Sequence, residues 1–279
     1  MKIAIQGIFG SNHHIVAYAY FGEDNELLCC HSFESVVQKL LNDEADMGVM
    51  AIENSLAGSI IPNYALLYNH RLKVIGEYYQ EISHHLMALN GQGIEDITEV
   101  HSHPMALLQC TNFFKTYPQI KLVEAADTAL VAQQIHKNKQ SGIAAIAPGL
   151  AANLYELETL ATDIQNLKTN STRFLIVTKE QGDLDTENAN KASLRFLTEH
   201  KRGSLAAILN MMSDCRLNLT KIQSLPVIET PWKYAFFVDV TFEDHSYFQK
   251  ALALIELMAE DAQVLGVYKN HLKQIQDQA

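Results

Sequence analysis

Two short segments of this 279-residue chain bring together side chains that could bind and activate a small anion. The first, residues 53–55 (ENS), directly follows a continuous apolar run at residues 47–52. Such a run is typical of a strand covered on both faces, and α/β proteins collect ligands at the C-terminal ends of such strands. Residues 58–59 (GS) then precede a helical stretch and offer backbone N–H groups for an anion. A polar turn that only caps a helix is the alternative.

The second segment, residues 169–177 (TNSTRFLIV), places polar groups and a positive charge at the entrance of an apolar strand at residues 174–177. Arg173 stands beside the hydroxyl group of Thr172. A buried guanidinium without a partner is costly, so Arg173 must meet a carboxylate of the protein or a carboxylate of a ligand. The residues of this segment alone leave both interpretations open.

Residues 100–110 (VHSHPMALLQC) contain two histidines one residue apart, which raises the question of a metal site. No third ligand stands at a recognisable spacing, and Pro104 indicates the first turn of a helix with Ser102 or His103 near its cap. The histidine pairs at residues 13–14 and 84–85 form no recognisable motif either. We therefore expect no metal site.

The composition is that of an ordinary soluble globular protein, with 48% apolar residues and a formal net charge of −11. This charge argues against nucleic acid and anionic membrane surfaces as partners, so an anionic ligand must be met by local positive groups. No apolar run approaches the ~20 residues of a membrane span, and the apolar run in MKIAIQG is too short for a signal peptide; both predict a cytoplasmic protein. The four cysteines are expected to be reduced and mostly buried.

The elements that must position these segments alternate between strand and helix up to residue 178, which predicts a mostly parallel α/β architecture. Strands are expected at residues 2–6, 27–31, 47–52, 122–123, 142–147 and 174–177, with a long extended segment at 73–89. Helices are expected after Ser11 and Ser32, from Pro104 to Phe114, from Asp127 to about His136, and after Pro148.

Residues 179–190 are the expected linker, because the polar stretch at residues 180–191 (EQGDLDTENANK) has one leucine and no periodicity. Beyond it, strands are expected at residues 192–197, 217–222, 234–242 and 264–268, and helices from near Gly203 and at 248–258. The resulting order β-α-β-β-α-β is the split, ferredoxin-like arrangement. Two such domains can pair across a two-fold axis, which predicts a homodimer.

In this order the segments resemble prephenate dehydratase over nearly the entire chain. The similar motifs are G-x-x-G-S at residues 7–11, I-E-N-S-x-x-G-S at 52–59, H-S-H-P-x-A-L-x-Q-C at 101–110, D-T-A at 127–129, A-A-I-A at 144–147 and N-x-T-R-F at 170–174. After the linker, G-S-L at residues 203–205 and N-L-T-K-I at 218–222 are similar to an ACT regulatory domain. One short motif would be weak evidence for a resemblance, whereas six motifs in the same order, followed by an appended domain, are specific to the family.

The resemblance implies a catalytic domain at residues 1–178 with two lobes, similar to periplasmic-type binding proteins, and an ACT domain at residues 191–279. Lobe one comprises about residues 1–75 and 168–178, and lobe two about residues 76–167. Thr172 is the implied catalytic residue. The implied substrate-binding residues are Ser11, Glu53, Asn54, Ser55, Ser59, Thr128, Asn170, Arg173 and Phe174; the implied effector-binding residues are Gly203, Ser204, Leu205, Ala206, Asn218 and Leu219.

The implied reaction converts prephenate to phenylpyruvate, with loss of carbon dioxide and of the ring hydroxyl as water, in L-phenylalanine biosynthesis. Aromatisation drives it, so no metal or redox cofactor is expected. Thr172 is expected to stabilise the leaving oxygen by a hydrogen bond. Arg173 and the N–H groups of residues 55–59 are expected to meet the substrate carboxylates, and Glu53 is either a proton relay or a partner of Arg173.

The resemblance also implies that L-phenylalanine binds between the ACT domains of a homodimer or homotetramer. The chain has Gln223 and Leu225 where the family has the acid and the arginine of E-S-R-P, which removes a possible ion pair and predicts altered affinity or coupling. Near the N-terminus, Ala51 replaces a common proline, and residues 8 and 12–13 also depart from the family pattern. An arogenate dehydratase and a non-catalytic amino-acid sensor are the alternative interpretations.

Overall fold

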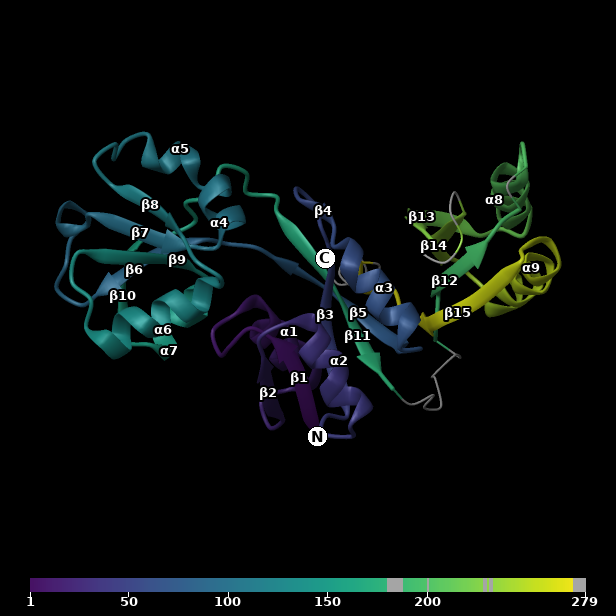
Figure 1. The fold of residues 1–279 in the computed structure, drawn as a ribbon, viewed down its shortest axis with the longest axis horizontal. Helices are drawn as coiled ribbons and strands as arrows, with labels where there is room; N and C mark the ends of the chain where they lie inside the picture. The colour runs from purple at the N-terminus through teal and green to yellow at the C-terminus, as the bar shows by residue number, and fades with distance from the viewer. Residues whose placement is uncertain (180–187, 200, 228–229, 231–232, 273–279) are drawn as a thin grey trace. The chain divides into compact units, whose positions relative to one another are not determined.

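The computed structural model describes residues 1–179, 188–199, 201–227, 230 and 233–272, which form three sheets with helices packed against them (Figure 1). The chain divides into two compact units. Unit 1 comprises residues 1–58 and 79–174, and unit 2 comprises residues 59–78 and 175–279. The expected linker at residues 179–190 falls largely on residues 180–187, which lie outside the described part of the chain.

The first sheet is formed by β1 (Lys2–Gln6), β2 (Glu26–Cys30), β3 (Met47–Asn54), β4 (Gly58–Ser59), β5 (Lys73–Glu81) and β11 (Ser171–Thr178). Its order is β2-β1-β3-β11-β5, with β4 paired to β3, and β1 runs parallel to β2 and β3 as predicted. The helices of these segments are α1 (Asn12–Phe21), α2 (Phe33–Leu41) and α3 (Ile61–Asn69). Ser11 and Ser32 cap α1 and α2 by accepting backbone N–H groups, which confirms the predicted helix starts.

The second sheet is formed by β6 (His85–Leu89), β7 (Glu99–Ser102), β8 (Lys121–Glu124), β9 (Ile143–Ala147) and β10 (Leu157–Ala161), in the order β10-β6-β9-β7-β8. Its helical elements are η1 (Ile94–Asp96), α4 (Pro104–Gln109), α5 (Thr111–Phe114), α6 (Thr128–Asn138) and α7 (Gly149–Leu154). Helices α4 and α5 pack on one face, and α6 and α7 on the other (Figure 1). β6 is antiparallel to β9 and β10, so the sheet is mixed rather than mostly parallel.

The prediction of one helix from Pro104 to Phe114 is wrong, because two helices occupy this stretch. The backbone N–H of Asn166 donates to the carbonyl oxygen of Gln109 at 2.7 Å. The side-chain oxygen of Asn166 then accepts the N–H of Asn112 at 2.9 Å. A loop that is distant in sequence therefore forms hydrogen bonds with backbone groups at both the end of α4 and the start of α5. Strands β7 and β10 were not predicted.

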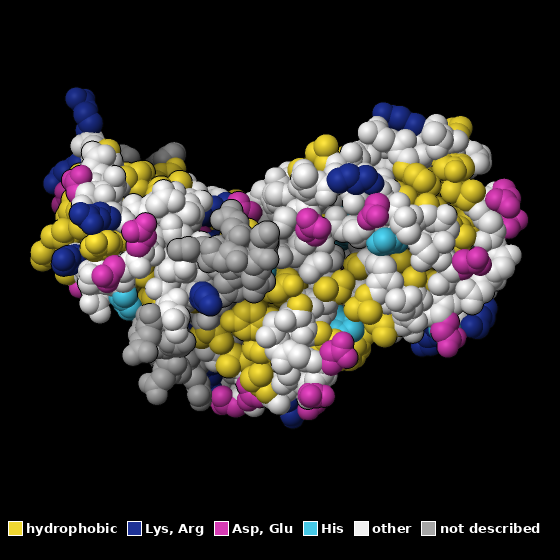
Figure 2. All heavy atoms as spheres, turned by 180° about the vertical axis from the view of Figure 1, so that it is seen from behind, with side chains coloured by type: hydrophobic (Ala, Val, Ile, Leu, Met, Phe, Trp, Pro, Cys, Tyr) yellow, Lys and Arg dark blue, Asp and Glu magenta, His cyan; other side chains and the backbone are white. Residues whose placement is uncertain are grey.

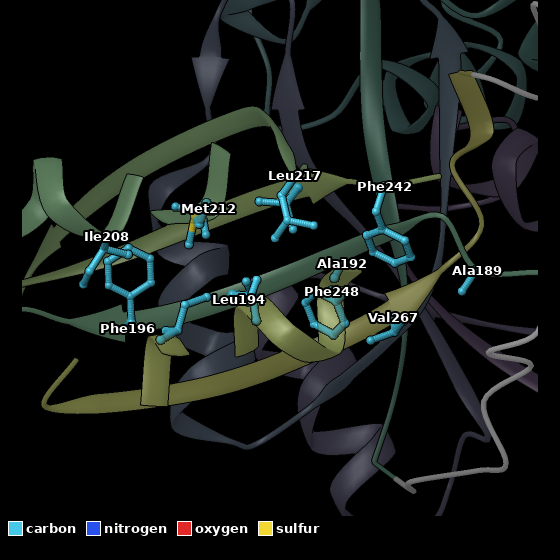
Figure 3. Packing of buried hydrophobic residues seen from close by; sticks show 14 residues of the cluster. Ala189, Ala192, Leu194, Phe196, Ile208, Met212, Leu217, Phe242, Phe248 and Val267 are labelled. Atoms are coloured by element: carbon cyan, nitrogen blue, oxygen red, sulfur yellow. The ribbon is translucent and has the colours of Figure 1, made fainter. Parts of the chain in front are cut away.

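The third sheet is formed by β12 (Lys191–Leu197), β13 (Asn218–Pro226), β14 (Tyr234–Thr241) and β15 (Asp261–Tyr268), with α8 (Ser204–Asp214) after β12 and α9 (His245–Met258) after β14. The predicted order β-α-β-β-α-β is confirmed, and the strands are antiparallel in the order β13-β14-β12-β15. Apolar side chains of both helices and of one face of the sheet share a core that includes Phe196, Ile208 and Phe248 (Figure 3). The other face of this sheet contacts residues 59–78 through both charged and aromatic side chains, such as Lys191 with Glu77 and Phe237 with Tyr64.

The surface and the cysteines agree only in part with the sequence predictions. On the described part of the face in Figure 2, basic side chains are scattered among acidic ones. Cys30 and Cys110 are buried as expected, Cys215 is partly buried, and Cys29 is exposed. None of the described helices is long and apolar enough to cross a membrane.

Candidate active site

The predicted site residues Asn54, Asn170 and Thr172 are brought into direct contact. β3 ends at Asn54, and β11, its neighbour in the first sheet, begins one residue before Thr172. The side-chain nitrogen of Asn54 donates to Oγ1 of Thr172 at 2.9 Å and to Oδ1 of Asn170 at 2.7 Å. Only 8% of Thr172 and 1% of Asn170 is exposed, so these bonds are largely shielded from water.

The oxygen of the Asn54 side chain organises the turn that follows β3. It accepts the N–H groups of Leu56 at 3.0 Å and Ala57 at 2.9 Å. The N–H of Ser55 donates to the carbonyl oxygen of Ser171 at 2.8 Å, and the N–H of Ser171 donates back to the Ser55 hydroxyl oxygen at 3.0 Å. The backbone N–H groups of residues 55–57 therefore donate to acceptors of the protein itself. The prediction that N–H groups of residues 55–59 bind a substrate anion stays a prediction.

The contact from Asn54 fixes the role that the Thr172 hydroxyl can play. Because an amide nitrogen only donates, Oγ1 of Thr172 must accept this bond, and its own hydrogen is left for another acceptor. Among the residues that the structure describes, no carboxyl group or imidazole is hydrogen-bonded to Thr172. The arrangement suits donation of a hydrogen bond by a neutral hydroxyl group.

A chain of hydrogen bonds continues from Asn170 away from Thr172. The side-chain nitrogen of Asn170 donates to Oε1 of Gln109 at 3.0 Å, and Nε2 of His84 lies 2.9 Å from the same oxygen. Since this amide oxygen only accepts, His84 carries its hydrogen on Nε2. Burial lowers the pKa of His84 below its usual value, so its imidazole is neutral near pH 7. The hydrogen-bonded groups from Asn170 to His84 are therefore all uncharged.

Sequence reasoning missed both Gln109 and His84. Gln109 lies inside the motif at residues 101–110, of which only the two histidines were considered as ligands. In the structure His101 is paired with Glu99 at 2.8 Å, and Nδ1 of His103 accepts the N–H of Met105 as the cap of α4. No group of three or more His, Cys, Asp or Glu side chains in the described ranges could hold a metal ion.

Ser11 and Thr128 lie at the starts of two helices that approach each other at Gly7. The oxygen of Ser11 caps α1, and Thr128 is the first residue of α6 after its cap Asp127. The backbone of Gly7 has a φ of +92°, and a Cβ at this position would lie 3.1 Å from Oδ2 of Asp127 and 3.3 Å from Cβ of Ser11. A glycine is required here for conformation and for space.

Arg173 and Phe174 occupy the buried part of β11. Successive side chains of a strand point to opposite faces, so Arg173 leaves β11 on the other side from Thr172. Its guanidinium carbon lies 6.0 Å from the ring centre of Tyr79. Phe174 packs edge-to-face on His13 at 4.9 Å, which holds α1 against this strand. The substrate contacts of both residues and of Glu53, which is half-buried, stay predictions.

The family model for prephenate dehydratase matches residues 3–182. The chain belongs to the prephenate dehydratase family. It is 35% identical to the chloroplastic arogenate dehydratase/prephenate dehydratase 2 of Arabidopsis thaliana, over 96% of this chain and 72% of that protein.

Two solved structures are similar to this member of the prephenate dehydratase family over 98% of its length. The prephenate dehydratase of Arthrobacter aurescens in complex with L-Phe has a TM-score of 0.89 and 25% identity, with 91% of that chain covered. GqqA, described as a novel type of quorum quenching acylase, also has a TM-score of 0.89 and 25% identity, with 100% of that chain covered.

Five of the six predicted effector residues of this prephenate dehydratase family member line two hollows of the third-sheet region. Residues 203–206 line one with a volume of about 390 Å³, together with Lys201 and Tyr234. Asn218 lines another of about 780 Å³ with Arg216 and Tyr247. Leu219 packs against the apolar core of α8 and α9. Within the described chain, one hollow therefore does not gather all six residues.

Proposed function

We propose that this protein is a prephenate dehydratase. The bond from the ring carbon to the carboxylate breaks to release carbon dioxide, its electron pair enters the ring, and the ring hydroxyl leaves and takes up one proton as water. The observation that supports this most directly is the bond from Asn54 to Oγ1 of Thr172, which leaves the Thr172 hydrogen free for the leaving oxygen. Donors aimed at a developing oxyanion are worth roughly 10²–10³ in rate.

The uncharged network around Asn170 favours hydrogen-bond stabilisation over proton relay. His84, at its far end, stays neutral because burial lowers its pKa. An ordinary threonine hydroxyl is a weak acid, so Thr172 donates a hydrogen bond and the proton that completes water comes from solvent. Asn54 and Asn170 act here as positioning residues for Thr172.

The remaining parts of the proposal follow the family. Residues 1–178 act as a two-lobed catalytic domain, and residues 191–279 as an ACT domain that binds L-phenylalanine in a homodimer or homotetramer in the cytoplasm. The L-Phe complex of the Arthrobacter aurescens protein and the hollow at residues 203–206 support effector binding. The division of Gly203 and Asn218 between two hollows supports a site completed by a second copy. Calorimetry that detects no binding at millimolar L-phenylalanine would refute this part.

The test is a steady-state assay of the purified protein with prephenate and, separately, with arogenate. We expect turnover of prephenate. Faster turnover of arogenate would establish the second candidate, which the Arabidopsis relative supports because it carries both activities in its name. Absence of turnover with either substrate, combined with tight binding of L-phenylalanine, would identify an amino-acid sensor instead. An N-acyl amide substrate should be inert; its hydrolysis would favour the activity named for GqqA.

A further inference from the structure

The third sheet and α3 border a hollow of about 890 Å³ that contains none of the predicted catalytic, substrate-binding or effector-binding residues. Its lining comes from α3, the turn after α3 and all four strands of the third sheet, and every lining residue belongs to unit 2. We propose that this hollow binds a small monocarboxylate with an apolar body, held by Arg195 and Arg71. Such binding requires no dehydratase activity, so it goes beyond the proposed function.

Arg195 lies on the face of the third sheet opposite the apolar core of α8 and α9. Its neighbours in β12, Leu194 and Phe196, belong to that core, and successive side chains of a strand point to opposite faces. Phe237 is the cross-strand partner of Arg195 in β14, so the two side chains share a face. A guanidinium group and an aromatic ring therefore lie side by side on the sheet face that borders the hollow.

Two aromatic contacts hold α3 on this face of the sheet. The ring centres of Tyr64 and Phe237 lie 5.3 Å apart, and the guanidinium carbon of Arg195 lies 3.8 Å from the ring centre of Tyr68. Tyr64 and Tyr68 are four residues apart, so they lie on the same side of the helix. Stacking on Tyr68 occupies the face of the guanidinium group and leaves its N–H groups to partners in its plane.

The hydrogen bonds of Arg195 leave part of its guanidinium group without an acceptor. Nη1 donates to a carboxylate oxygen of Asp261, whereas Nε is shielded from water and has no hydrogen-bond partner among the described residues. Only 3% of the Arg195 side chain is exposed, and a buried N–H without an acceptor is costly. A carboxylate is the acceptor that matches this group best, because it takes two parallel N–H groups of one guanidinium.

The charges and the apolar walls of the hollow favour a monoanion with an apolar body. The charged side chains that line it are those of Arg71, Arg195 and Asp261. Asp261 is matched by Arg195, so exposed Arg71 adds one excess positive charge in a chain with a net charge of −11. Buried Ala235 and Phe237 supply apolar surface for the body of the ligand. Small-molecule sites typically have volumes of about 300–1,000 Å³, so the hollow is large enough.

The test is isothermal titration calorimetry of the full chain with 3-phenylpropionate, a monocarboxylate with one aromatic ring. This acid has no ammonium group, which separates it from an amino-acid effector. We expect saturable binding of the acid, and binding at least about tenfold weaker for the uncharged 3-phenylpropionamide, because the charge-assisted contacts are lost. Absence of binding at millimolar acid, or equal affinities for the acid and the amide, would overturn the inference.

Three variants locate the bound acid. Arg71→Met should raise Kd about tenfold or more. Ala65→Phe, which fills the hollow from α3 without changing a charge, should abolish binding. The matched control is Arg202→Met, which removes an equal charge from an exposed residue of unit 2 outside the lining and should leave Kd unchanged.

Arg195→Met should also abolish binding of the acid. If this variant fails to fold, Arg71→Met decides the matter, because Arg71 is exposed and its replacement leaves the buried contacts of Arg195 in place. An unchanged Kd in Arg71→Met or in Ala65→Phe would place the acid elsewhere and overturn the inference. An equal rise of Kd in Arg202→Met and Arg71→Met would also overturn it, since the net charge alone would then explain the affinity.

Discussion

Asn54 allows a direct experiment on how the site directs the hydrogen of Thr172. Its nitrogen donates to Thr172 and Asn170, and its oxygen accepts the N–H groups of Leu56 and Ala57. The substitution Asn54→Asp keeps the shape of the side chain and its accepting oxygen but replaces the donor with a second acceptor. We expect the Thr172 hydroxyl to turn and donate to the new carboxylate, which withdraws its hydrogen from the substrate.

The expected loss of kcat depends on which hydrogen bonds of Thr172 each variant changes. Withdrawing the donor from the leaving oxygen should lower kcat by roughly 10²–10³. Asn54→Ala removes the bond but adds no competing acceptor, so its loss should be smaller, on the order of tenfold. In Asn54→Asp, the carboxylate also faces the side-chain oxygen of Asn170, at a cost of about 1–3 kcal/mol. A domain with the usual stability of roughly 5–15 kcal/mol stays folded under that cost.

The assay follows phenylpyruvate absorbance under saturating prephenate, with thermal unfolding of each variant as the folding control. The distinguishing result is the order of the two variants: the isosteric Asn54→Asp should be slower than the truncated Asn54→Ala. If Asn54→Asp is as fast as Asn54→Ala, or if both stay within about threefold of wild type, the orientation assigned to Thr172 is wrong.

Three further outcomes concern stability. Lys191→Met should lower the free energy of unfolding, measured in urea, by about 3–5 kcal/mol, because the Glu77 carboxylate stays buried without this ammonium group. Adding Glu77→Leu should restore much of the lost stability. A decrease below about 1 kcal/mol in Lys191→Met would contradict this prediction. Gly10→Ala should cost roughly 1–3 kcal/mol more than Gly22→Ala, since both glycines have a positive φ but only at Gly10 would a Cβ lie 3.1 Å from a neighbour; equal melting temperatures would disprove the close packing. Burial lowers the pKa of His13 from 6.5 to about 3, so below pH 6.5 the unfolded chain binds a proton that the native state refuses, and stability should fall toward pH 3 by up to about 1.4 kcal/mol per pH unit. His13→Gln should remove that part of the slope, and an unchanged slope would show that His13 does not titrate in this way.

The starts of helices were predictable because their signals are local. Ser11, Ser32 and Asp127 each accept an N–H three residues ahead, a contact that a short window of sequence contains. The break after α4 was not predictable, because it depends on Asn166, which lies 54 residues along the chain from Asn112. The apolar run at residues 174–177 indicated β11 but not that the polar residues before it belong to the strand.

The site was predictable in its residue types and not in its hydrogen bonds. The motifs at residues 52–59 and 170–174 indicated that Asn54 and Thr172 share a site, and the structure places them in contact. Which groups remain free for a ligand depends on the direction of each bond, and the sequence does not encode this in any short pattern. For the same reason Gln109 was missed, since its partner Asn170 is distant in sequence.

The most direct measurement of the central claim is kcat for Thr172→Ala against Thr172→Ser, at saturating prephenate and with folding checked for both. Removal of the hydroxyl should lower kcat by roughly 10²–10³, whereas serine keeps the oxygen that Asn54 contacts and should retain most of the activity. A loss below about tenfold in Thr172→Ala, or an equal loss in both variants, would show that the hydroxyl of Thr172 does not stabilise the leaving group.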